Sequence, residues 1–569
     1  MSAFDYIIVG AGTASAVLAN RLSADPSIKV LLLEQGSTCY HPAAYLPGLH
    51  SHAQSQSIGA KSVPVGPERF LKDRVLHTQY AQGVGGSSAI DTMLYLRGHP
   101  LDFDHWAHSG AKGWDYAHCL PYFKKLERHA TQSDSYRSQS GPFSVTSSNT
   151  DHPLTKAYLE AGIQAGYGKT TDFNGSRQEG FGPLDAAISN GLRVSAASAY
   201  LKSIRKRPNL TILTNCQATQ IQLEGKIAKG VHYKKGSTTN VASAQKEVII
   251  AAGAIGSPHL LQVSGIGPES TLKAAGVPIC HALPGVGENL QDHLHVAMQL
   301  ECRKPVTLTN RKSTAHQISA LLQWITQRTG DWSQNHIDAA GFLRSRSGIR
   351  WPDIHFQLHP HTKRTNGILT NPSGFQVITG PCRPQSRGWL RITSKNIGDY
   401  PHMMYNAQSS PYDRETFRRC IRLARELLDQ PAMDTLRGTE LSPGRDIHFN
   451  DEIDDWVQCN AQSANDMCGT NKMGEEVDPM AVVNHECKVI GIHQLRVVDS
   501  SIFPTIPNGN LIAPTLMVAE RAADMILGQP LLEQEAAPFW EDAHWEIRQR
   551  EGHPLPQFNT ETTKETDPF

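Results

Sequence analysis

The chain lacks three features that would each have narrowed its function. Its ten cysteines are scattered and none forms a CxxC pair, so no metal site is expected, and the thiols are interpreted as mostly reduced in an intracellular protein. Its 54 basic and 54 acidic residues cancel, which gives no argument for nucleic acid or an acidic membrane surface as a partner. No apolar run reaches the roughly 18 residues of a membrane-spanning helix. A strand that begins near residue 4 leaves no room for a signal peptide, so we expect a cytoplasmic protein.

A dinucleotide-binding pattern stands at the N-terminus. Residues 6–9 are apolar and predict a buried parallel strand, which a glycine turn and a helix follow. A second apolar strand, residues 29–33, ends in a carboxylate at about the spacing that suits a ribose hydroxyl. The helix N-terminus would hold a pyrophosphate, with a small serine in place of the third glycine of the fingerprint. The predicted dinucleotide contacts are Gly10, Gly12, Thr13, Ser15 and Glu34.

Four further motifs follow in order along the chain. A glycine–serine loop spans residues 82–91, and a glycine-rich helix start spans residues 248–267. A Pro-Gly-Val-Gly-Glu-Asn segment leads to Asp292 and His293, and an Asn-Gly-Asn turn lies at residues 508–510. Together with the N-terminal pattern, these segments resemble the glucose-methanol-choline (GMC) oxidoreductase family from about residue 4 to 528.

The resemblance implies an α/β fold in which a Rossmann-like FAD-binding domain is interleaved with an α+β substrate domain built on an antiparallel sheet. The expected boundaries are 1–299 and 462–530 for the FAD-binding domain, 300–461 for the substrate domain, and 531–569 for a polar tail. It also implies FAD as cofactor. By position in the family motifs, the flavin and adenine contacts would be Gly85, Gly86, Ser87, Ser88, Asp91, Ala218, Asp499, Asn510, Leu511 and Ile512.

Two positions in the glycine–serine loop bear on the flavin. Some family members anchor FAD covalently through a histidine, and that position is Ile90 here, so non-covalent FAD is expected. Asp91 replaces a common asparagine, and a carboxylate there would disfavour the anionic reduced ring unless it were protonated.

The expected substrate domain contains a strand whose polar residues alternate. Residues 353–361 place His355, Gln357, His359 and His361 on one face. This strand is interpreted either as half-exposed with solvated histidines or as bringing one histidine, His359, into the substrate pocket. An amphipathic helix is expected within residues 303–335, with Leu321, Leu322 and Ile325 facing inward.

The catalytic positions depart from the family pattern. The family usually carries a histidine three residues before a Gly-Thr pair, and here that position is Asp466, with Asn465 beside it. The second polar position falls on Ile512, which cannot hydrogen-bond through its side chain. An aspartate has an ordinary pKa of about 3.9, so burial must raise it before it is an effective base. Asp466, Asn465 and His359 are the catalytic candidates.

Three functions stay open from the sequence. The first is hydride transfer to flavin from an alcohol-type (CH–OH) small molecule, with an altered base. The second is oxidative coupling or dehydrogenation of a phenolic natural product, since a phenol with a pKa of about 10 asks less of the base. The third is a lyase-like protein that holds FAD without redox turnover. The tail is expected to be a solvated extension, although Trp540 and Trp545 also allow an intermolecular arm, and a homodimer is possible.

Overall fold

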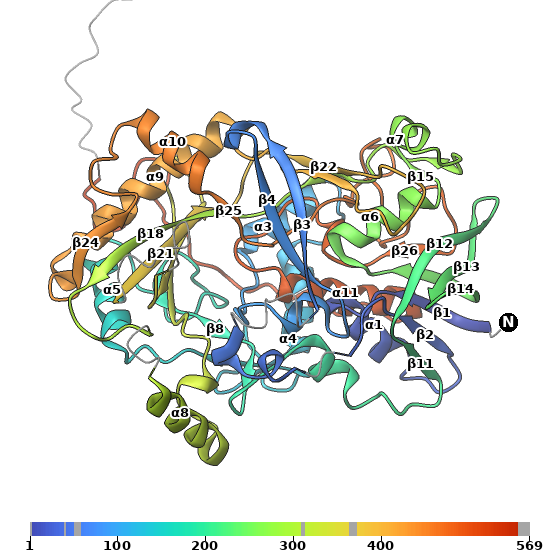
Figure 1. Cartoon of the computed structure of the whole chain (residues 1–569), viewed down its shortest axis with the longest axis horizontal. Coiled ribbons are helices and arrows are strands. Elements are labelled where there is room, and N and C mark those ends of the chain that lie inside the picture. The colour runs from blue at the N-terminus through green and yellow to red at the C-terminus, as the bar shows by residue number, and fades with distance from the viewer. Residues whose placement is uncertain (1–2, 39–40, 51–58, 309–312, 363–372, 556–569) are drawn as a thin grey trace, which may run out of the picture.

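The computed structural model describes residues 3–38, 41–50, 59–308, 313–362 and 373–555. Two large sheets organise the chain, and they occupy opposite halves of the molecule in Figure 1. Within the described residues, no helix has the length and apolar character needed to cross a membrane. The pattern of a mostly parallel sheet beside an antiparallel one confirms the predicted fold class.

The first sheet forms where apolar, β-branched segments are buried on both faces. Its strand order is β11 (Leu210–Leu213), β2 (Val30–Leu33), β1 (Ala3–Val9), β14 (Thr238–Ile250), β13 (Ile227–Lys235) and β12 (Cys216–Glu224), and β26 (Leu495–Val497) pairs with β14. Strands β11, β2, β1, β14 and β26 are parallel, so their carboxyl ends meet at one edge. Helices α1 (Thr13–Leu22), α4 (Tyr116–Leu126), α6 (Gly253–Val263) and α11 (Ile512–Leu527) cover this half. The edge where the strands end is therefore where a ligand would bind.

The second sheet is antiparallel throughout. Its order is β24 (Arg437–Ser442), β18 (Leu294–Cys302), β21 (Gly374–Pro381), β20 (Ile354–His359), β19 (Ala339–Leu343) and β7 (Gly180–Pro183), with β25 (Gln462–Ser463) on β18. Helices α5 (Pro153–Gln164), α9 (Pro411–Leu428) and α10 (Asn450–Asn460) pack on this half (Figure 1). Strand β7 comes from the segment that the sequence assigned to the FAD half. The interval that the sequence assigned to the FAD half therefore also contributes strands to the second sheet.

Helix α8 (Thr314–Gln327) forms inside the interval where the sequence predicted it, but its apolar face points toward solvent. Ile318, Leu322 and Ile325 are 55%, 56% and 54% exposed, and the helix projects from the body in Figure 1. Trp324 holds it to the body, because its indole N–H donates to the carbonyl of Gly191 at 2.8 Å, and His316 and Gln317 contact the following segment at Asp331 and Trp332. The prediction that Leu322 and Ile325 face inward is wrong, because periodicity alone gives an apolar stripe and not what that stripe meets.

Parts of the C-terminal segment up to Gly552 are docked on the body of the protein rather than solvated. The guanidinium carbon of Arg177 lies 3.8 Å from the centroid of the Trp540 ring. The backbone N–H of Trp540 donates to the carbonyl of Ser176. Asp542 is 2% exposed and pairs with the buried Arg344 at 2.8 Å. Over these residues the expectation of a solvated extension is wrong, because carboxylates and tryptophans that look like a polar tail in sequence find arginine partners across the chain.

Candidate functional site

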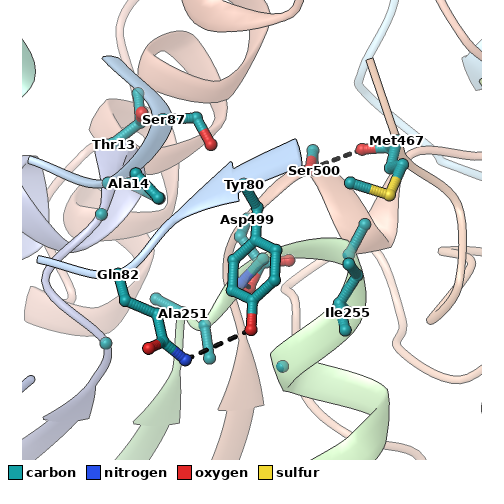
Figure 2. A pocket seen from close by; sticks show the side chains of 18 of the residues that line it. Thr13, Ala14, Tyr80, Gln82, Ser87, Ala251, Ile255, Met467, Asp499 and Ser500 are labelled. Atoms are coloured by element: carbon teal, nitrogen blue, oxygen red, sulfur yellow. Dashed lines mark hydrogen bonds between the residues drawn. The ribbon is translucent and has the colours of Figure 1, made fainter. Parts of the chain in front are cut away.

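A cavity of about 530 Å³ lies at the carboxyl edge of the parallel sheet. Its walls come from the segments after β1, β2, β14 and β26, from strand β4 (Arg74–Ala81), and from the start of α11. Figure 2 shows Thr13 and Ser87 at one side of this cavity and Ser500 and Met467 at the other. A volume of this size is within the range of roughly 300–1,000 Å³ typical of cofactor and small-molecule sites.

Close backbone approach explains the glycines of the two loops. A Cβ at Gly10, whose φ is +95°, would lie 2.6 Å from the carbonyl oxygen of Ala251. A Cβ at Gly86 would lie 2.7 Å from Cα of Gly12, and the N–H of Gly85 donates to the carbonyl of Ala11 at 2.7 Å. The glycine–serine loop is thus packed against the N-terminus of α1. That helix has no side-chain cap at Gly12, which leaves backbone N–H groups for an anion.

The predicted ribose ligand is placed to bind a hydroxyl. Glu34 is buried and lines the cavity, and its two oxygens each accept one backbone N–H, from Ala11 and Gly36, at 2.7 Å. Burial raises the pKa of Glu34, while these N–H groups oppose that rise. A carboxylate can accept several hydrogen bonds, so Glu34 can also accept one from a ribose hydroxyl in the cavity. Ala218, on β12, lines the same end of the cavity.

Two predicted contacts act through the scaffold instead. Ser15 lies outside the cavity lining and donates its hydroxyl to the carbonyl of Ala251 at 3.0 Å, which joins α1 to β14. Ser88 lines the cavity, but its hydroxyl donates to the carbonyl of Gly85 at 2.6 Å and accepts the N–H of Ala196. Of the loop residues, Gly86, Ser87, Ser88 and Asp91 line the cavity, and Gly85 does not.

Asp91 forms an ion pair that the sequence did not reveal. Its Oδ1 accepts from Nη1 of Arg193 at 2.6 Å and from the N–H of Met93 at 2.9 Å. Burial raises the pKa of Asp91 to about 6, and the Arg193 guanidinium opposes that rise. The carboxylate that replaces the family's asparagine is therefore compensated by a neighbouring cation.

Asp499 and Asn510 also line the cavity. The carboxylate of Asp499 accepts from the N–H of Gly253 at 2.8 Å and from the hydroxyl of Ser257 at 2.6 Å, which fixes the start of α6 beside the cavity. Asn510 lines the cavity, and its Oδ1 is buried with no hydrogen bond from any described residue. Leu511 and Ile512 line the cavity where α11 begins. These groups fit FAD: the carboxylate of Glu34 suits the ribose hydroxyls, the close-packed glycines suit the pyrophosphate, and the unpartnered oxygen of Asn510 suits a ring N–H.

Asp466 lines the cavity and has a partner that lies outside it. Its Oδ2 is 3.1 Å from Nδ1 of His293, and its backbone N–H donates to Oδ1 of Asp292 at 2.8 Å. Nε2 of His293 is 2.8 Å from the carbonyl oxygen of Cys382. Burial alone would lower the pKa of His293, yet the hydrogen bond and charge of Asp466 raise it above its usual value.

The other two catalytic candidates are placed differently. The side chain of Asn465 turns toward β4, where its Oδ1 accepts from the N–H of Gln79 at 2.7 Å and from the hydroxyl of Thr78 at 3.1 Å. His359 is buried on β20, beside Gln376 in the sheet register, and it is not among the residues that line the cavity. Asn465 and Asp466 both line the cavity, but the Asn465 oxygen is taken up by β4, so Asp466 is the candidate that offers a carboxylate oxygen to a substrate.

The sequence singled out the Asp292–His293 motif without assigning it a role, and it gave no sign of Arg193. The signal for His293 was its place six residues after Gly287 in a glycine-rich segment, which by itself favours structure as much as chemistry. What the assembled site can do is accept a proton at Asp466, next to a cavity that fits a dinucleotide.

Comparison with known proteins gives a consistent result. Two family models, both described as GMC oxidoreductase, match residues 4–295 and 384–519. The chain is 44% identical over 552 residues to an oxygen-dependent choline dehydrogenase of Photobacterium profundum, covering 96% of this chain and 97% of that protein. It is 45% identical to one of Vibrio vulnificus, covering 97% and 99%. The structure of pyridoxine 4-oxidase from Mesorbium loti superposes with a TM-score of 0.85 at 29% identity, covering 93% of this chain and all of that one.

Proposed function

The chain belongs to the GMC oxidoreductase family, and from that premise we propose that it oxidises the CH–OH group of a small alcohol with non-covalent FAD. The observation that carries the proposal is the continuity of one cavity from the glycine cradle and Glu34 to Asp466. Relatives that cover nearly the whole chain are named choline dehydrogenases, which puts small alcohols first among candidate substrates.

The cavity residues divide the work of holding the cofactor. Gly10, Gly12 and the uncapped N-terminus of α1 would take the pyrophosphate, and Glu34 the adenosine ribose. Asn510 and the start of α11 would hold the flavin end, where FAD, when bound, supplies the acceptor for the substrate's hydride. Attachment by a covalent bond at the family's histidine position has no support, since Ile90 offers no nucleophile.

The residues of this chain then have to remove a proton. A substrate hydroxyl beside Asp466 would give its proton to that carboxylate, because Oδ1 of Asp466 accepts no hydrogen bond from any described residue. Ile512, which lines the same cavity at the first turn of α11, offers no side-chain hydrogen bond to that substrate.

A second candidate is dehydrogenation or coupling of a phenol. The observation that favours it is the pair of departures at Asp466 and Ile512, which remove both of the family's usual polar groups. A phenol ionises more readily than an alcohol, so this reaction tolerates their loss. A non-redox role is the third possibility and predicts a flavin that no substrate reduces.

An anaerobic visible spectrum separates these functions. Purified protein would be mixed with small primary alcohols, choline and pyridoxine among them, and separately with phenols. Loss of the flavin band with an alcohol supports the proposal, loss with phenols alone supports the second candidate, and an unbleached band supports the third. Acid precipitation of the same sample tests the cofactor, since non-covalent FAD stays in the supernatant.

A further inference from the structure

His293 and Asp466 come from segments 173 residues apart and meet beneath the cavity. His293 follows β17 (Glu288–Leu290), and Asp466 follows β25. The imidazole side chain is 4% exposed and the carboxylate side chain 13%, so Asp466 is the member that reaches the cavity.

The carbonyl of Cys382 fixes the tautomer of His293. A carbonyl oxygen can only accept, so Nε2, at 2.8 Å, must carry a hydrogen. Nδ1 then faces Oδ2 of Asp466 at 3.1 Å. Two lone pairs cannot form a hydrogen bond, so this contact holds one proton between the imidazole and the carboxylate.

Asp292 and Ser463 hold the carboxylate in position. Oδ1 of Asp292 accepts the backbone N–H of Asp466 at 2.8 Å, and its other oxygen accepts the hydroxyl of Ser463. Burial raises the pKa of Asp292 to about 7, and the nearby charge of Asp466 adds to the rise. The backbone of Asp466 is therefore anchored while its Oδ1 is left for a substrate.

We propose that Asp466 and His293 act as one proton-accepting unit, in which Asp466 receives the substrate's hydroxyl proton and His293 stores it. This inference rests on the proposed alcohol oxidation. The O–H bond of the alcohol breaks and its proton goes to Asp466, while the hydride from carbon goes to the acceptor named there. The step starts from the pair that has lost its shared proton at higher pH. Rotation of the carboxyl group about its Cβ–Cγ bond then brings the substrate's proton to Nδ1, which restores the hydrogen bond seen in the structure.

The unit resolves the difficulty that an aspartate is a poor base. Isolated aspartate ionises near 3.9 and imidazole near 6.5, and a base works best when its pKa is near the working pH. Coupling Asp466 to His293 gives the pair the proton affinity of an imidazole at a position where the chain carries a carboxylate. His293 is thus a positioning residue that acts through Asp466.

Other titratable groups surround the pair and could contribute to its pH dependence. They are Asp91, Asp292, His295, His355, Tyr405 and Cys468. The test therefore compares the wild type with variants in which all of these residues are kept. His118, whose Nδ1 lies 2.7 Å from Asp115 on the surface, provides a matched histidine–aspartate control.

The first measurement needs no substrate. FAD-loaded wild type, His293→Gln, Asp466→Asn and His118→Gln are unfolded in urea between pH 5.5 and 9. A raised histidine pKa stabilises the fold below the unfolded value of about 6.5, and that stabilisation is lost as pH rises through the folded value. The wild-type unfolding constant should rise about tenfold more over this range than that of His293→Gln.

Asp466→Asn keeps the hydrogen bond and removes the shared proton, because its amide can donate to the neutral Nδ1. Burial then lowers the pKa of His293 with only the charge of Asp292 and the carbonyl of Cys382 to oppose it. The stabilisation that a protonated His293 gives the wild type should therefore be reduced, and the unfolding constant of Asp466→Asn should rise less with pH than that of the wild type. His118→Gln should follow the wild type. If the wild type and His293→Gln show the same pH dependence, the shared proton is overturned.

The second measurement is the anaerobic rate of flavin reduction by an alcohol against pH. The wild-type rate should rise through one ionisation above pH 6.5, whereas His293→Gln should be flat above about pH 5.5 with a plateau about 100-fold lower. An unchanged profile in His293→Gln overturns the proposal. If no alcohol reduces the wild-type flavin, the proposed function and this role both fail, and the unfolding curves alone decide whether the proton is shared.

Discussion

Nη1 of Arg193 donates to Oδ1 of Asp91 at 2.6 Å, so the carboxylate that lines the cavity at the proposed flavin position is paired with a cation. Asp91→Asn removes the negative partner and leaves the guanidinium, which favours an anionic reduced ring. We expect the flavin midpoint potential to rise by about 30 mV at pH 7.5, equivalent to about 1.4 kcal/mol for a two-electron couple.

The pH dependence of that change provides its own control. The pKa of Asp91 is raised by burial to about 6, so the carboxyl group is ionised at pH 7.5 and mostly protonated at pH 5. The potentials of wild type and Asp91→Asn should therefore converge as pH falls to 5. A difference that is the same at both pH values would contradict the assignment to this carboxylate.

The contact between the glycine loops should determine FAD affinity. In Gly86→Ala the new methyl group would lie 2.7 Å from Cα of Gly12, so the loop must move away from the start of α1. We expect FAD to bind at least about tenfold more weakly, a cost of about 1.4 kcal/mol, when apoprotein is titrated with FAD. Gly236→Ala is a matched control, since Gly236 has a similar φ of +59° but nothing within 4 Å of its added methyl.

The docked C-terminal segment should stabilise the fold. Asp542→Asn removes one carboxylate from Arg344, which is fully buried and keeps Glu179 as its other partner. We expect a loss of about 3 kcal/mol in the free energy of unfolding, measured in urea at pH 7. Glu541→Gln breaks the neighbouring exposed pair with Arg350 and should cost less than about 1 kcal/mol.

Acid should remove the same contribution from the wild type. Although burial opposes it, hydrogen bonds from Arg548, His544 and Arg344 hold the pKa of Asp542 down at about 2. A carboxyl group with a depressed pKa stabilises the fold above the unfolded value of about 3.9, and this stabilisation is lost as the pH falls toward 2. The stability difference between wild type and Asp542→Asn should therefore shrink between pH 4 and 2.

Restoring the family's two polar side chains at positions 466 and 512 should increase the rate at which simple alcohols reduce the flavin. Asp466→His with Ile512→Asn replaces both departures, and a positioned base contributes typically 10²–10⁴-fold to such a step. We expect anaerobic flavin reduction by simple primary alcohols to accelerate by at least about 100-fold relative to wild type. Each single variant is the control, and a double variant no faster than wild type would show that these positions do not limit alcohol oxidation.

Local signals in the sequence were sufficient for the cofactor cradle. The strand, glycine turn and helix at residues 6–22 lie next to each other along the chain, and Glu34 ends the next strand of the same unit. Short-range geometry fixes where such residues lie, and the structure places Gly10, Gly12, Thr13 and Glu34 on the cavity wall. Alternation along residues 353–361 likewise predicted β20, since period two is a property of the strand itself.

Only the tertiary structure decided what Asp466, helix α8 and the C-terminal segment contact. Asp466 meets His293 across 173 residues, and Arg344 meets Asp542 across 198. The apolar stripe of α8 could be read from its period, but its exposure could not. The sequence by itself determined the nucleotide-binding unit and the departure of Asp466 and Ile512 from the family pattern, because both are local. Tertiary folding decided which distant groups share a proton or a charge, because hydrogen bonds and ion pairs depend on distance in space rather than on separation along the chain.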